Sequence, residues 1–154
     1  IDDKGELSYS ISLDGEAKHH YLCFQYHSFQ FMDLYYSYEI IGGERLKLLL
    51  KKLSNFLSIN SIHECHSKKD CFNTTVKTFY YDAILMLALY KIDDLGFHKT
   101  RHMAFSLEKN LLSNQLKNGS FFYSLNNYYL LHDKRFYPRP LSMILHSLIE
   151  KELK

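Results

Sequence analysis

A stripe of polar side chains runs along the first long helical segment that the sequence predicts, residues 19–41. At about 100° per residue, its members fall within roughly 60° of one another on the helix: His19, Tyr26, Gln30, Asp33 and Ser37. A tyrosine and an aspartate on a cavity wall can exchange protons with a substrate, which makes Tyr26 and Asp33 the catalytic candidates. His19 and Gln30 could hydrogen-bond the same substrate. The alternative is that the stripe is simply the solvent face of the helix.

A second group of candidates lies in the loop before the last predicted helix, which contains both prolines of the chain. Arg135 and Arg139 could hold a carboxylate or a phosphate through forked hydrogen bonds, with Tyr137 between them. His146, two turns into the helix, could face the same cavity, although a lone histidine often belongs to ordinary packing. The alternative for the loop is that its prolines stiffen the turn while the arginines bond helix carbonyls or Asp133.

The polar segment between residues 58 and 73 contains side chains that can bind zinc: His63, Cys65, His66 and Cys71. Zinc sites usually pair their cysteines as Cys-x-x-Cys units, and this spacing matches no such pattern. We therefore predict no metal site, and we expect no cofactor. Two alternatives remain for the segment: a flexible polar loop with incidental histidines and cysteines, or a disulfide between Cys65 and Cys71.

Composition narrows the classes of function. A chain of 154 residues, 46% of them hydrophobic, is long enough for one domain with a real core. The formal net charge of +2 is too balanced to predict binding to nucleic acid or to a membrane surface. No apolar run approaches the ~20 residues that a membrane-spanning helix needs. The sequence also lacks a glycine-rich phosphate loop, a Gly-x-Ser-x-Gly elbow and a His-Glu-x-x-His pair.

The beginning of the chain shows no secretion signal, and its first residue is Ile1 rather than Met. We therefore expect this domain to be a fragment of a larger protein. Residues 1–18, which are polar and interrupted by Gly5 and Gly15, should form a loop or a short β-hairpin. Residues 19–154 should form a domain of helical hairpins. The sequence does not indicate the compartment in which the protein works.

The helical segments alternate in character. Mostly apolar and amphipathic segments follow one another along the chain, beginning with an apolar one: residues 19–41, 44–57, 75–92, 98–117 and 141–153. This order predicts two antiparallel hairpins, 19–57 and 75–117, followed by a third inner helix. Because inner helices carry few charges, we expect the first and third segments to be markedly more buried than the second and fourth. The aromatic segment 119–140 before the last helix could hold a short pair of strands.

A near-repeat adds to this pattern. Residues 4–10 (KGELSYS) return in similar form as residues 118–124 (NGSFFYS), each ahead of a long helical pattern. Repeats of this kind indicate an architecture of stacked, similar units.

With its alternating helices, the chain resembles the α/α-toroid superfamily, whose members are rings of helical hairpins. Tyr26-His27-x-x-Gln30 with Leu34 looks like a short pattern in the helical domains of glucuronyl epimerases. Residues 115–121 (QLKNGSF) look like the turn that ends a hairpin in terpenoid-cyclase barrels.

The resemblance implies an all-α fold, here an arc or half of an α/α toroid, since the chain is too short for a complete ring. The carbohydrate-active members, which include uronate lyases and glucuronyl epimerases, imply a domain that processes or binds an acidic carbohydrate. The alternative is a non-catalytic helical-repeat scaffold, and a third hypothesis is an isoprenoid-handling barrel, although the aspartate-rich magnesium clusters of that chemistry are missing. Whether the domain is an enzyme stays open. Expected partners are an acidic oligosaccharide and either the rest of the polypeptide or a second copy, but not nucleic acid.

The ring architecture makes one geometric prediction. Loops that lead into the inner helices of a ring lie at the same end, so the loop before the last helix should lie near the starts of the other two. Arg135, Tyr137 and Arg139 should then share a concave surface with part of the polar stripe on residues 19–41. A group on the second inner helix should lie at a similar depth: Tyr80, Tyr81 and Asp82.

Overall fold

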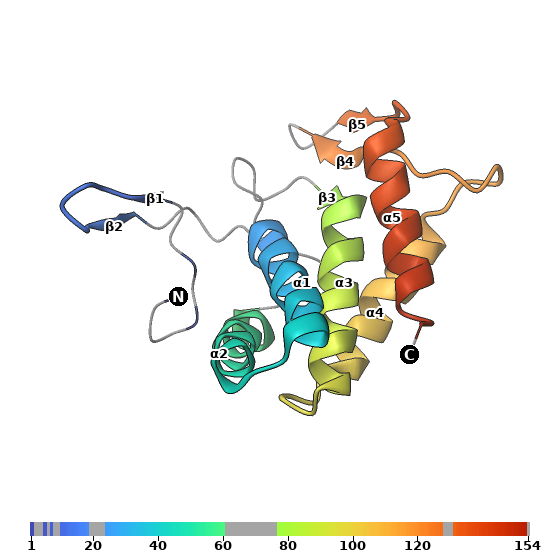
Figure 1. The fold of residues 1–154 in the computed structure, drawn as a ribbon. Helices are drawn as coiled ribbons and strands as arrows, with labels where there is room; N and C mark the ends of the chain where they lie inside the picture. The colour runs from blue at the N-terminus through green and yellow to red at the C-terminus, as the bar shows by residue number, and fades with distance from the viewer. Residues whose placement is uncertain are drawn as a thin grey trace.

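The computed structural model describes residues 1, 5, 7, 10–18, 24–60, 77–127 and 131–153 of the chain. Within these residues it has five helices and five short strands (Figure 1), so the chain is mostly helical, as the sequence predicts. The helices are α1 (Phe24–Ile41), α2 (Glu44–Asn60), α3 (Phe79–Asp94), α4 (Arg101–Ser113) and α5 (Pro138–Glu150). The strands are β1 (Ser10–Ile11), β2 (Ala17–Lys18), β3 (Lys77–Thr78), β4 (Ser124–Asn127) and β5 (Leu131–Asp133).

Two glycines separate α1 from α2. Gly42 and Gly43 have φ angles of 69° and 100°, a left-handed conformation that glycine adopts without the steric cost of a Cβ. The Gly42 N–H donates to the Tyr38 carbonyl oxygen at 2.7 Å, which closes the last turn of α1. Glu44 follows in the first turn of α2, where a carboxylate interacts favourably with the helix dipole. The turn that the glycine pair predicts is therefore present.

α3 is the central helix of the domain, since it contacts α1, α2, α4 and α5. In Figure 1, α1, α3 and α5 lie side by side and run in the same direction, away from the end that carries β3, β4 and β5. α2 packs against α1, and α4 packs against α3. The first turns of α1, α3 and α5 therefore lie at one end of the domain.

The burial prediction is confirmed for the second hairpin and wrong for the first. Most residues of α3 are buried, whereas α4 buries only three. α1, however, is no more buried than α2. α2 and α3 cover part of its surface, but Tyr26, Gln30 and Asp33 are exposed. Low charge did not predict burial in α1 because tyrosine, glutamine and isoleucine occupy several of its exposed positions.

The strands near the start of α3 were only partly predicted. The pair expected within residues 119–140 is present as β4 and β5, and β3 adds a third strand on the other side of β4. β3 has only two residues directly before a helix, too few for a recognisable strand pattern. The register pairs Ser124 with Thr78 on one side and with Asp133 on the other. This sheet joins the start of α3 to the loop before α5. β1 and β2 form a separate antiparallel hairpin.

The two C-terminal helices differ from their predicted bounds. α4 ends at Ser113 rather than 117, because the chain then turns, with the Gly119 N–H donating to the Leu116 carbonyl oxygen at 2.8 Å. α5 begins at Pro138 rather than 141. A proline at the start of a helix causes no loss of a helical hydrogen bond, since the first N–H groups of a helix have no partner within it.

α5 is anchored at its middle and at its C-terminal end. At its middle, Ile144 joins Phe79, Ala83, Leu111 and Phe121 in an apolar cluster.

At its C-terminal end, α5 is held by contacts of two lysines. Lys91 of α3 is only 4% exposed and donates from Nζ to the carbonyl oxygens of Glu150 at 3.3 Å and Leu153 at 3.1 Å. The Lys151 ammonium pairs with the Glu108 carboxylate of α4. The two bonds from Lys91 satisfy carbonyl groups that a helix end otherwise leaves unpaired.

Candidate functional site

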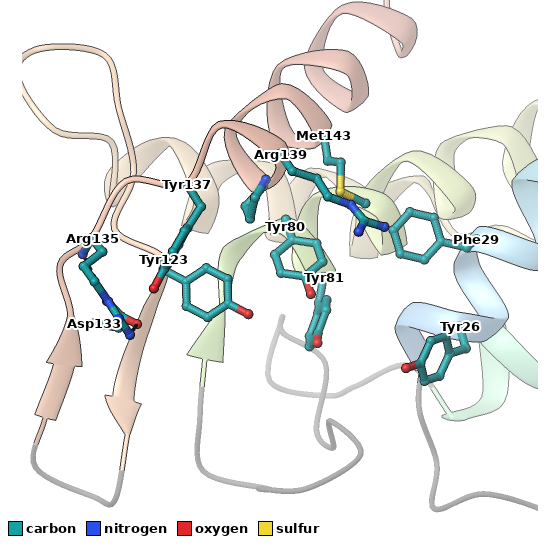
Figure 2. A pocket seen from close by; sticks show the side chains of 11 residues that line it. Tyr26, Phe29, Tyr80, Tyr81, Tyr123, Asp133, Arg135, Tyr137, Arg139 and Met143 are labelled. Carbon is teal, nitrogen blue, oxygen red and sulfur yellow. Dashed lines mark hydrogen bonds and ion pairs between the residues drawn. The ribbon is translucent and has the colours of Figure 1, made fainter.

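A cavity of about 660 Å³ opens at the end of the domain where α1, α3 and α5 begin (Figure 2). This volume lies within the range of small-molecule sites, about 300–1,000 Å³. The residues that line the cavity come from α1, α3, α5 and the segments around β4 and β5: Tyr26, Phe29, Tyr80, Tyr81, Tyr123, Asp133, Arg135, Tyr137, Arg139, Pro140 and Met143. The sheet of β3, β4 and β5 brings most of these segments together.

One wall of the cavity is a row of tyrosines. The Tyr80 ring centroid lies 4.2 Å from that of Tyr81 and 6.1 Å from that of Tyr123. The Tyr123 ring meets the Tyr137 ring edge-on at 4.9 Å, and the Arg135 guanidinium lies 5.2 Å from the Tyr137 centroid. Edge-on contacts between two rings, and cation–π contacts between a guanidinium and a ring, are stabilising and favour defined orientations. The row is therefore a preformed surface with phenol groups along it.

The Tyr80 hydroxyl group of this wall is neutral at physiological pH. Burial raises the pKa of Tyr80 above its usual value, and the neighbouring Tyr81 phenol raises it further. A neutral phenol can both donate and accept a hydrogen bond, which suits a ligand that carries hydroxyl groups.

Asp133 and Arg135 form a two-point ion pair at the edge of the cavity. Arg135 donates from Nε to Oδ1 at 2.9 Å and from Nη2 to Oδ2 at 2.6 Å. The Arg135 backbone N–H also donates to Oδ1 at 3.1 Å. The hydrogen bonds from Arg135 lower the pKa of Asp133, so the carboxyl group stays ionised. The positive charge of Arg135 is therefore already matched by a carboxylate.

Arg139 has no such partner among the described residues. It is exposed and makes no ion pair with any residue that the structure describes. Figure 2 shows its side chain reaching from the start of α5 into the cavity, toward Phe29 and beside Met143. The first turn of α5 contains no acidic residue. Because a helix N-terminus itself carries partial positive charge, a cation there is unfavourable without an anion nearby.

The structure divides the polar stripe on α1. Tyr26 is 50% exposed and lines the cavity, with its hydroxyl on the cavity side. Gln30 and Asp33 are also exposed, but they lie further along α1 and do not line the cavity. Their positions match the alternative interpretation, in which this part of the stripe is a solvent face.

Other candidates lie elsewhere. Nε2 of His146 lies 3.4 Å from the Tyr36 hydroxyl, between α5 and α1, and His146 does not line the cavity. Five candidates fall outside the described residues: His19, His63, Cys65, His66 and Cys71. Within the described ranges, no group of three or more histidine, cysteine, aspartate or glutamate side chains could hold a metal ion.

Sequence reasoning missed part of the cavity wall. Tyr123 and Phe29 were not among the candidates, although Tyr123 belongs to the near-repeat. The strand pairing places it, since the Tyr123 N–H donates to the Asp133 carbonyl oxygen at 3.0 Å. The Asp133–Arg135 pair did have a sequence signal: residues two apart in an extended segment point to the same side.

The arrangement suits binding better than proton transfer. Asp133 is the one carboxylate among the described residues that line the cavity, and its lowered pKa makes it a poor general acid. The cavity offers aromatic surface, tyrosine hydroxyl groups and the positive charge of Arg139, which no described residue matches with an ion pair.

Comparison of the chain with protein-family models, with curated proteins and with solved structures found no significant match. None of the helices that the structure describes is both long enough and apolar enough to cross a bilayer.

Proposed function

We propose that this domain binds an acidic carbohydrate in the tyrosine-lined cavity. The observation that carries the proposal is the guanidinium of Arg139, which pairs with no described carboxylate and lies beside a wall of phenol rings. Sugar rings present apolar C–H faces that pack on aromatic rings, and their hydroxyls bond neutral phenols. A guanidinium binds a carboxylate through two parallel hydrogen bonds. A uronate-containing sugar carries all of these features.

The arrangement of helices supports the architecture that goes with this proposal. α1, α3 and α5 run side by side in the same direction, while α2 and α4 pack against α1 and α3. Inner and outer helices would follow one another in this order in an arc of an α/α toroid, and the cavity would then lie at the starts of the inner helices. Another part of the polypeptide, or a second copy, would complete the ring.

The direct test is calorimetric titration of uronate oligosaccharides into the wild-type domain and Arg139→Ala. A hydrogen-bonded charge contact contributes about 1.5–3 kcal/mol, so we expect the variant to bind roughly ten- to a hundredfold more weakly. Lys109→Ala, which removes the same charge from an exposed position on α4, is the matched control and should bind like the wild type. The affinity for neutral oligosaccharides of equal length should change little in either variant.

Equal uronate affinity of the wild type and Arg139→Ala would remove Arg139 from the site. If neither protein binds uronate oligosaccharides, the second hypothesis, a non-catalytic helical-repeat scaffold, is favoured.

That second candidate, a non-catalytic helical-repeat scaffold, has its own observation. A groove of about 310 Å³ lies between α5 and residues 115–121, lined by Phe121, Leu141 and Leu145 among others. Leu145 and Ile149 are 58% and 52% exposed on the surface of α5. α1 and α3 each have an amphipathic helix packed against them, and among the described elements α5 has none of its own. A partner helix would cover this surface.

An isoprenoid-handling barrel has less support. Such a function needs a deep apolar cavity, whereas the lining of this one includes five phenol groups, a carboxylate and two guanidinium groups.

A further inference from the structure

We propose that Asp133 limits the cavity to ligands that bring one anionic group, so that it selects a singly charged carbohydrate over a polyuronate of equal length. This inference rests on the proposed function, because it concerns the same cavity and the same class of ligand. Its basis is the number and placement of charges around the cavity.

Three charged side chains line the cavity within the described part of the chain: Asp133, Arg135 and Arg139. Their formal sum is a single positive charge. Arg135 uses both Nε and Nη2 on the Asp133 carboxylate. Among the described residues that line the cavity, Arg139 therefore carries the one positive charge left for a ligand.

The Asp133 carboxylate is fixed in position. Its side chain is only 10% exposed, and three donors of Arg135 hold its two oxygens. The backbone on either side is also held, since the Asp133 carbonyl oxygen accepts from the Tyr123 N–H. The carboxylate cannot turn away from an approaching anion without breaking these bonds.

The charges lie at different places along the tyrosine wall. Figure 2 shows the Asp133–Arg135 pair beside Tyr137 at one side of the cavity, and Arg139 reaching in from α5 toward Phe29. A ligand with one carboxylate can place it at Arg139 and lay its neutral part against the tyrosines. A second carboxylate at the other end meets a guanidinium that is already neutralised and a carboxylate that repels it.

The test compares two disaccharides, one with a single uronate joined to a neutral sugar and one with two uronates, in the wild type and in Asp133→Asn. Asparagine keeps an oxygen for the Arg135 N–H but removes the negative charge, which frees the guanidinium. We expect the wild type to prefer the singly charged disaccharide. In Asp133→Asn the affinity for the doubly charged one should rise about three- to tenfold relative to the other, and added salt should reduce this gain.

Asp94→Asn is the matched control, because it removes an exposed carboxylate at the other end of α3 and should leave the ratio of affinities unchanged. Arg135→Gln gives a second, opposite readout that does not depend on Asp133→Asn folding. It leaves Asp133 ionised and unpaired, so both disaccharides should bind more weakly, the doubly charged one most.

The outcomes separate the two proposals. Equal binding of both disaccharides to the wild type, with a ratio that neither variant changes, overturns the role of Asp133 and leaves the carbohydrate site standing. No binding of either disaccharide to the wild type overturns both.

Discussion

Arg135 and Arg139 line the same cavity, but only Arg135 is paired with a carboxylate among the described residues. Arg139 sits in the first turn of α5, where the partial charges of the helix N-terminus repel a cation. A side chain that lowers the stability of the fold at its position indicates a role in binding. The effects of Arg139 on stability and on binding can each be measured.

We predict that Arg139→Ala raises the free energy of unfolding by about 0.3–1 kcal/mol, the usual size of a helix-dipole interaction, while it weakens uronate binding. Urea unfolding monitored by circular dichroism gives the first quantity, and calorimetry the second. Lys109→Ala, which changes a residue of α4 outside its first and last turns, should alter neither quantity by as much. A loss of stability in Arg139→Ala would show that the side chain is structural.

Burial differs sharply between two neighbouring residues of α5, which fixes how the helix faces the core. Ile144 is 2% exposed and Leu145 is 58% exposed. Ile144→Ala should lower the free energy of unfolding by about 2–4 kcal/mol, through lost transfer energy and the cavity left behind. Leu145→Ala should change it by less than about 0.5 kcal/mol. Chemical denaturation of both variants checks this, and equal effects would mean that α5 faces the core differently.

The contact between Glu108 and Lys151 joins α4 to the end of α5, and it makes stability depend on pH. Burial alone would raise the pKa of Glu108, but hydrogen bonds from Lys151 and Tyr90 outweigh it, so the pKa lies below its usual value of 4.5. A carboxyl group with a lowered pKa in the folded state stabilises it fully above the unfolded-state pKa. That contribution is lost as the pH falls through the folded-state pKa.

We therefore predict that Glu108→Gln lowers the free energy of unfolding at pH 7 by about 1.5–3 kcal/mol, the contribution of a hydrogen bond to a charged group. Between pH 7 and pH 3 the difference from the wild type should shrink, because the wild type loses its own contribution below about pH 4.5. Thermal unfolding over this pH range measures the effect. Lys109→Gln is the control, and a difference that stays constant with pH would contradict the assignment.

The whole domain is organised around α3, which four other helices contact. Local openings are rarest where backbone hydrogen bonds lie deepest in apolar packing. α1 packs against α2 and α3, and its residues Tyr26, Gln30 and Asp33 stay exposed. The free energy of local opening should therefore decrease from α3 to the helices at its sides.

Hydrogen exchange followed by mass spectrometry tests this order. Amides in residues 83–89 of α3 should exchange slowest, at a rate set by global unfolding, and amides in residues 26–33 of α1 should exchange faster. Equal protection of the two segments would indicate a bundle in which all helices are equally buried.

Much of the secondary structure could be predicted because its signals are local. The glycine pair at 42 and 43 ends one helix by its backbone freedom. A proline fits the first turn of the last helix because that turn needs no N–H partner, although this helix begins at Pro138 rather than at the predicted residue 141. The nearly uncharged run of α3 predicted burial correctly, since α3 is surrounded by other helices.

The same argument failed for α1, because the burial of a helix depends on what packs against it. Tyr26 and Asp33 share a stripe in the sequence, yet only Tyr26 reaches the cavity. The sequence alone indicated some of the residues that line the cavity, among them Tyr26 and Arg139, and roughly where the helices lie. The tertiary structure decided which of them meet: the pairing of β3, β4 and β5 brings Tyr80, Tyr123 and Asp133 together from distant parts of the chain. The tertiary structure also decided which arginine is paired with a carboxylate. Such pairing depends on distances of a few ångströms between side chains, and no local sequence pattern contains them.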